Sequence, residues 1–115
     1  MVSDKTYKLI FWCAVLIVLL LSLLPISAPE LELFQWQDKF HHFMTYSGLC
    51  FFGIQAYGQN HSVWVIGSIL VLFGLVIELA QSLTGYRFVD PIDLAANTLG
   101  IIVAGVFLHK QRNKL

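Results

Sequence analysis

The chain has 115 residues and a formal net charge of zero, with 57% hydrophobic and only 12% charged residues. Its mean hydropathy of +0.73 exceeds what a soluble domain of this length needs for its core. The sequence contains no Gly-rich phosphate loop, no zinc-type motif and no basic nucleic-acid patch, so we predict no cofactor, no metal and no nucleic-acid partner. We therefore expect one membrane domain that spans residues 1–115 and has the lipid bilayer as its first partner.

The first apolar stretch covers residues 7–24 and is closed by Pro25. It is long enough to cross the hydrocarbon core, about 30 Å thick, as one helix. A secretory signal peptide is the alternative, because two lysines precede the stretch and residues 26–28 resemble a cleavage site. Pro29 at the following position and the long apolar core favour a retained helix.

Three more helices are predicted at residues 38–57, 62–83 and 93–109. The second is polar at its start and apolar afterwards, and the third is apolar until Glu78. The acidic segment before the second helix contains Trp36, an aromatic residue that suits the membrane interface. The predicted fold class is all-α, an integral membrane bundle of four transmembrane helices.

The basic residues are concentrated at the two chain ends. Five of the seven lysines and arginines lie in these tails: Lys5, Lys8, Lys110, Arg112 and Lys114. Basic segments next to membrane helices usually stay in the cytoplasm. We therefore expect both termini to be cytoplasmic, with the loops around Glu30 and Tyr86 facing outward.

This topology brings the polar residues of three helices to the outer face. Helical spacing places each set on one side of its helix: Asp38, His42 and Tyr46 on the second, Glu78 and Gln81 on the third, Asp93 and Asn97 on the fourth. We predict an outward-facing polar pocket. Its candidate binding residues are Asp38, Lys39, His42, Glu78, Gln81, Arg87, Asp90, Asp93 and Asn97.

Among these residues Glu78 gives the strongest indication of a site. An ionised carboxylate about five residues inside a membrane helix is costly unless it is paired. Arg87 is its strongest expected partner, since a guanidinium holds a carboxylate with two hydrogen bonds. A purely structural ion pair is the alternative. Asp38, Asp90 and Asp93 have a second reading as helix caps, and Lys39 has one as a side chain that reaches out to the headgroups.

Small residues follow the pocket on the fourth helix. Ala96, Gly100 and Ala104 recur every four residues, a pattern that lets helix backbones approach closely in lipid. Cys13 and Cys50 both fall in apolar runs, and we interpret them as small packing residues.

The polar motifs resemble those of the VanZ-like family of small bacterial membrane proteins, named for a protein associated with teicoplanin resistance. The resemblance rests on Asp38-Lys39-x-x-His42-Phe43, Glu78-x-x-Gln81, and Arg87-x-x-Asp90-x-x-Asp93-x-x-x-Asn97-Thr98-Leu99-Gly100. It covers residues 38–105. It implies a multi-pass protein of the bacterial cytoplasmic membrane with a role in the cell envelope and in glycopeptide susceptibility, but no particular reaction.

Two classes of function fit the pocket. It could bind an envelope component, namely a lipid headgroup, a cell-wall precursor or a glycopeptide. Alternatively, it could belong to a membrane-embedded hydrolase or transferase, with Glu78 or Asp93 as general base, His42 as proton shuttle and Arg87 as anion clamp. A metal enzyme using Asp38, His42, Glu78 and Asp93, and a purely structural assembly partner, remain further alternatives. Whether turnover occurs and whether the protein oligomerises stay open.

Overall fold

The computed structural model describes residues 3–23, 37–83 and 91–113, and the four expected helices are present there. They are α1 (Asp4–Leu23), α2 (Gln37–Tyr57), α3 (Val63–Leu83) and α4 (Pro91–Asn113). The helix ends differ from the expected ones by up to four residues. The fourth helix begins at Pro91 rather than Asp93, because proline has no N–H to leave unpaired in a first turn and its φ already suits a helix.

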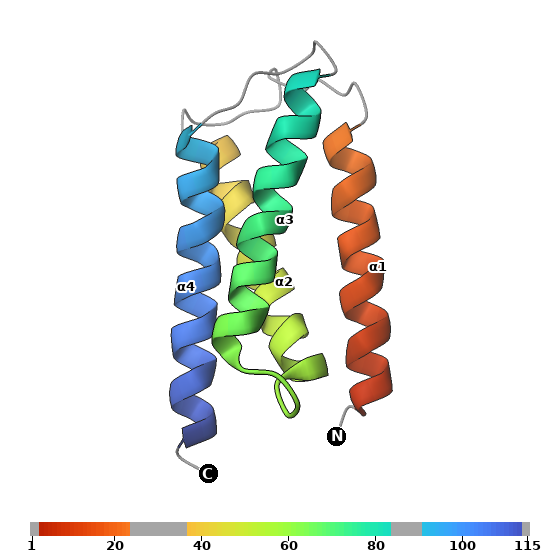
Figure 1. Cartoon of the computed structure of the whole chain (residues 1–115), viewed down its shortest axis with the longest axis vertical. Coiled ribbons are helices and arrows are strands. Elements are labelled where there is room, and N and C mark those ends of the chain that lie inside the picture. Colours follow the sequence, from red (N-terminus) through yellow and green to blue (C-terminus); the bar gives the residue numbers. More distant parts are fainter. Residues whose placement is uncertain (1–2, 24–36, 84–90, 114–115) are drawn as a thin grey trace.

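Successive helices run in opposite directions, so that the N- and C-termini lie at the same end of the bundle (Figure 1). In that view α1 and α4 form opposite sides, α3 lies in front and α2 lies behind. The helices α2 and α4 run in the same direction and share the most extensive helix–helix contact. The starts of α2 and α4 therefore lie at the same end as the last turns of α1 and α3.

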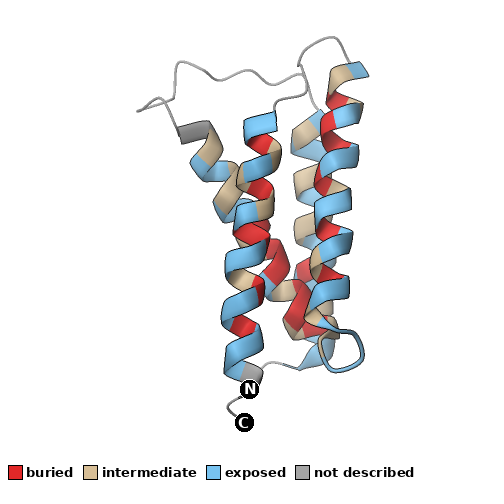
Figure 2. Ribbon diagram, turned by 60° about the vertical axis from the view of Figure 1, so that its left-hand side comes forward, coloured by how far each residue is buried: buried red, intermediate tan, exposed pale blue. Residues whose placement is uncertain are grey.

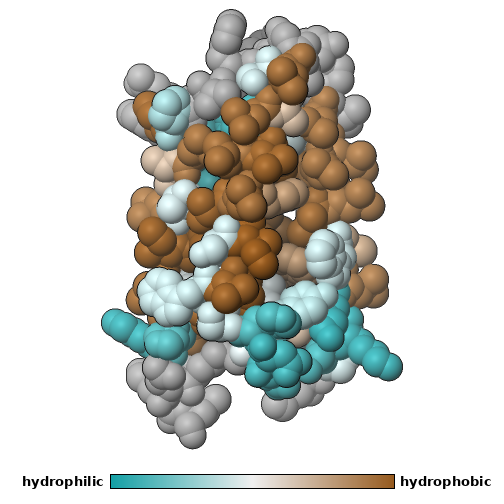
Figure 3. Space-filling model, in the orientation of Figure 1, coloured by the Kyte–Doolittle hydropathy of each residue, from teal (hydrophilic) through white to brown (hydrophobic). Residues whose placement is uncertain are grey.

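Three of the helices are long and apolar enough to cross a membrane: α1, α3 and the Pro91–Gln111 part of α4. In α2 the polar residues at the start lower the apolar content. Hydrophobic side chains cover the middle of the surface, and hydrophilic ones gather at the end that carries the termini (Figure 3). Trp64 on α3 is 72% exposed. Such a broad apolar surface is unfavourable in water and fits contact with lipid.

The helix α2 is nevertheless the centre of the bundle. Its Leu49, Cys50 and Ile54 are the largest fully buried side chains in the described part of the chain. They pack with Phe11 of α1 and Leu70 of α3, among others. Buried residues lie on the facing sides of the helices and exposed residues on the outside (Figure 2).

The helices α2 and α4 approach most closely at Gly100. A Cβ atom there would lie 2.3 Å from the backbone oxygen of Phe43, so no side chain fits. Beside it, the Ser47 hydroxyl donates a hydrogen bond to the Gly100 carbonyl at 3.0 Å. Cys50 Sγ lies 3.5 Å from the Ile101 carbonyl. The expected close packing is confirmed here, as is the packing role of Cys50; Cys13 differs, being exposed on α1.

We predict that Gly100→Ala destabilises the protein, because the new methyl group must push α4 away from α2. Overpacking of this kind costs about 1–3 kcal/mol. The midpoint of thermal unfolding of the purified protein in detergent measures the effect.

Gly48→Ala is the matched control, since a Cβ at Gly48 would meet nothing within 4 Å. This substitution should leave the midpoint unchanged or raise it slightly, because alanine favours the helix. Equal midpoints for the two variants would contradict the close contact at Gly100.

Candidate functional site

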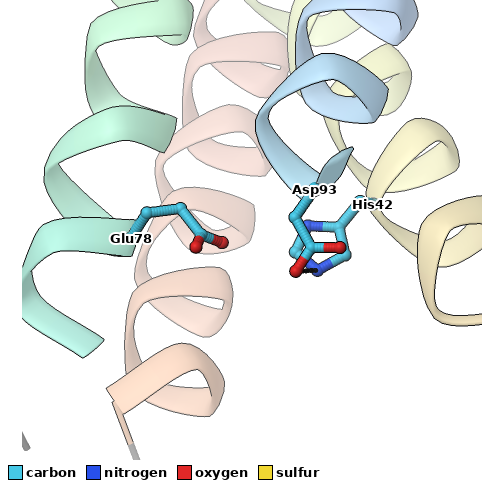
Figure 4. Close-up of side chains that lie close together, drawn as sticks. All are labelled: His42, Glu78 and Asp93. Carbon is cyan, nitrogen blue, oxygen red and sulfur yellow. Dashed lines mark ion pairs between the residues drawn. The ribbon is translucent and has the colours of Figure 1, made fainter. Parts of the chain in front are cut away.

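Three ionisable side chains converge at the end of the bundle opposite to the termini. His42 comes from the second turn of α2, Glu78 from near the end of α3 and Asp93 from the first turn of α4. All three point into the space between the helices (Figure 4). Glu78 is 2% and Asp93 6% exposed. The juxtaposition expected from the order of the helices is therefore present among these residues.

Asp93 contacts a side chain from each of the first two turns of α2. The Lys39 ammonium lies 2.9 Å from Asp93 Oδ1, and His42 Nε2 lies 3.6 Å from Asp93 Oδ2. Within the described part of the chain, Oδ1 has no hydrogen bond of favourable angle, so the Lys39 contact is an ion pair only. The partial positive charge of the α4 N-terminus adds to the stabilisation of the carboxylate. Lys39 thus turns inward to Asp93 instead of reaching out to the headgroups.

A hydrogen bond to Asn97 orients the His42 ring. His42 Nδ1 lies 2.9 Å from Asn97 Oδ1. An amide oxygen only accepts hydrogen bonds, so with this placement of the amide Nδ1 must carry the proton. The amide nitrogen of Asn97 faces α3, where a Cβ at Gly74 would lie 3.2 Å from it. Asn97 therefore depends on a glycine in the neighbouring helix for its position.

Gln81, a candidate binding residue, also contacts α1. Its amide nitrogen donates a hydrogen bond of 2.7 Å to the Ser22 carbonyl of α1. Gln81 thus ties the last turn of α1 to α3, at the edge of the cluster. Near the middle of α1, the Trp12 indole donates a hydrogen bond to the Tyr57 hydroxyl at 2.6 Å.

Three of the predicted site residues cannot be placed. Arg87 and Asp90 lie outside the described residues, and so does the side chain of Asp38. The expected Glu78–Arg87 pair therefore stays a prediction. Glu78 itself has further interactions, and its carboxylate points toward His42 and Asp93.

A cavity of about 190 Å³ opens beside the cluster. Its walls combine polar and apolar side chains from all four helices: Val18, Leu21, Ser22, His41, His42, Thr45, Tyr46, Ile77, Glu78, Gln81 and Asn97. The contribution of α1 was missed by the sequence interpretation. A signal for it exists, since Ser22 is the one hydroxyl residue in the apolar run 9–24.

Comparison of the chain with models of known protein families, with curated proteins and with solved structures gives no match. The functional proposal therefore rests on the chemistry of the cluster. Two buried carboxylates, an oriented imidazole and an ammonium group can bind a ligand rich in hydroxyl groups, transfer a proton or hold a cation.

We predict that Lys39→Met lowers the thermal unfolding midpoint, because it leaves the buried Asp93 carboxylate without its ammonium partner. Adding Asp93→Asn should restore part of the loss, since the amide carries no charge. The expected coupling free energy is about 1–3 kcal/mol for residues in direct contact. Thermal unfolding of the two single variants and the double variant measures it.

Lys110→Met provides the control, because Lys110 is exposed on the far end of α4. It should change the midpoint little. Strictly additive effects of Lys39→Met and Asp93→Asn would show that the two side chains do not interact.

Proposed function

We propose that the chain is a VanZ-like protein of the bacterial cytoplasmic membrane, with four transmembrane helices and cytoplasmic termini. Three helices of sufficient length and apolar content support this. The position of α2 also supports it, because α2 returns the chain from the end of α1 to the start of α3 at the opposite end of the bundle. The two basic tails support the orientation.

In this topology, Leu31→Cys in a cysteine-free background reacts with a membrane-impermeant maleimide in intact cells, whereas Asn113→Cys reacts only after the membrane is permeabilised. Position 31 lies outside the described residues, but it follows the end of α1 that faces outward in the proposal. Labelling of position 113 in intact cells would refute the orientation.

We propose further that the cavity binds the polar headgroup of an envelope lipid or a lipid-linked cell-wall precursor. The observation that carries this proposal is the amphipathic wall of the cavity, which combines the buried Glu78 carboxylate with the apolar Val18, Leu21 and Ile77. A headgroup with hydroxyl or amide donors finds acceptors in Glu78 and Asn97. The apolar side chains suit the start of its hydrocarbon chain.

Altered susceptibility to glycopeptide antibiotics is the phenotype that the resemblance implies, and binding of a cell-wall precursor would fit that phenotype. Arg87 belongs to the same sequence motif as Asp93, and its guanidinium would hold the phosphate of such a ligand. Lys39 is engaged with Asp93 and fixes the carboxylate.

A hydrolase or transferase acting on the same headgroup is the second candidate. The observation that favours it is the His42 ring, whose Nε2 faces Asp93 while Nδ1 is held by Asn97. With the proton on Nδ1, Nε2 can accept a proton from a hydroxyl or water nucleophile in the cavity.

We expect Glu78→Gln and Arg87→Lys each to abolish an effect on glycopeptide susceptibility while the protein still accumulates in the membrane. Glu78→Gln keeps the shape but loses charge and basicity, and Arg87→Lys loses the planar fork. Native mass spectrometry of the purified protein should also show the loss of co-purified lipid in Glu78→Gln.

Asp4→Asn is the matched control, because it removes a carboxylate that is exposed at the other end of α1. It should leave both readouts unchanged. A purely structural role would instead give reduced abundance in both single variants, partly restored by combining Glu78→Gln with Arg87→Met. Full function in both single variants would refute the site.

A further inference from the structure

We propose that His42, Glu78 and Asp93 bind one divalent transition-metal ion, of the Zn²⁺ or Mn²⁺ type, at the wall of the cavity. This inference goes beyond headgroup binding and does not require it. From the sequence we predicted no metal and kept a metal enzyme that also used Asp38 only as an alternative; the spatial arrangement of the three side chains changes this interpretation.

The first step is the orientation of the His42 ring. His42 Nδ1 lies 2.9 Å from Asn97 Oδ1, and the ring is held with Nε2 toward Asp93, whose Oδ2 lies 3.6 Å away. An imidazole nitrogen and a carboxylate oxygen at this separation can share a proton or coordinate one metal ion. The geometry of this atom pair therefore suits two ligands of the same ion.

The second step is the third ligand. One ligand atom of each of His42, Glu78 and Asp93 lies within 4.8 Å of the other two. Around a metal with bonds of about 2.0–2.2 Å, neighbouring ligand atoms are about 3.0–3.5 Å apart. Small rotations of the side chains close this difference, since Glu78 already points toward the other two (Figure 4).

The third step is the support around the ligands. A metal-bound histidine usually donates its other N–H to an oxygen that fixes the ring, and Asn97 Oδ1 accepts that hydrogen bond here. Lys39 contacts Oδ1 of Asp93, so Oδ2 remains the atom beside His42. Asn97 and Lys39 are thus positioning residues for two of the three ligands.

The ligand chemistry selects the class of metal. One imidazole and two carboxylates suit Zn²⁺ or Mn²⁺, whereas Mg²⁺ favours oxygen ligands and keeps several waters. Neither cysteine contributes, because Cys50 contacts the Ile101 carbonyl in the α2–α4 contact and Cys13 is exposed on α1. Three protein ligands beside an open cavity leave a position for water or a headgroup oxygen.

The test uses the full chain purified in detergent and stripped with EDTA, then titrated with Zn²⁺ or Mn²⁺ alone by isothermal calorimetry. We expect one ion per chain, with Mg²⁺ binding at least about 10-fold more weakly. His42→Ala and Asp93→Asn should abolish the binding. Asn97→Ala should weaken it about 10- to 100-fold, as is usual for residues that orient a metal ligand.

His61→Ala is the matched control, because His61 is exposed between α2 and α3, at the opposite end of the bundle from the site. It should bind the ion as tightly as the unaltered chain. Absence of saturable binding in the unaltered chain, or unchanged binding in His42→Ala, would overturn the proposal.

X-ray absorption of the Zn²⁺-loaded unaltered protein gives a readout that does not depend on whether the variants fold. The expected first shell contains nitrogen and oxygen with one imidazole, and a sulfur ligand would overturn the site. Lipid that co-purifies with a chain unable to bind metal would refute this inference alone. Stoichiometric metal with no headgroup binding would refute the proposed function alone.

Discussion

Gly100 allows the backbone of α4 to approach α2 so closely that polar groups of the two helices meet directly. In lipid there is little hydrophobic force between helices, so close van der Waals packing and hydrogen bonds must hold them together. Ser47 and Cys50 of α2 each reach a carbonyl of α4 at this contact. Because the two helices run in the same direction, the contact continues toward their common start and sets the distance between the residues found there.

The cluster is built on that contact. His42 reaches Asn97 one turn above Gly100, and Lys39 reaches Asp93 one turn further on. The helix α3 closes the third side with Glu78, and Gly74 leaves room for the Asn97 amide. A buried carboxylate costs several kcal/mol unless it is paired and hydrogen-bonded. The groups that stabilise the Asp93 carboxylate therefore come from α2 and α4, the two helices whose close approach Gly100 allows.

The arrangement also explains why one cavity serves more than one hypothesis. An oriented imidazole and two carboxylates can accept hydrogen bonds from a headgroup, take a proton from a nucleophile or coordinate a metal. The hydrolase and the metal site both use the His42 ring that Asn97 orients, whereas headgroup binding uses Glu78 and Asn97 as acceptors. In the hydrolase Nε2 takes a proton, and in the metal site Nε2 coordinates the ion together with Asp93.

The sequence by itself determined the four helices and the grouping of their polar residues. Apolar runs of membrane length and the spacing of Glu78, Asp93 and Asn97 are local properties that any single helix must show. The rule that successive helices reverse direction was enough to place α2, α3 and α4 polar residues at one end. The glycine at position 100 also predicted the close contact, because the spacing of small residues along one helix is likewise a local property.

Only the tertiary structure decided which side chains meet. Lys39 was a candidate binding residue with headgroup contact as the alternative, and the rotation of α2 against α4 turns it to Asp93. Gln81 was a candidate binding residue and lines the cavity, and the position of α1 also gives it the Ser22 carbonyl as a partner. The facing of His42 Nε2 and Asp93 Oδ2 depends on helix rotation and on side-chain torsions. Helical spacing defines the face of a residue on its own helix, but not the atom on the next helix that it touches.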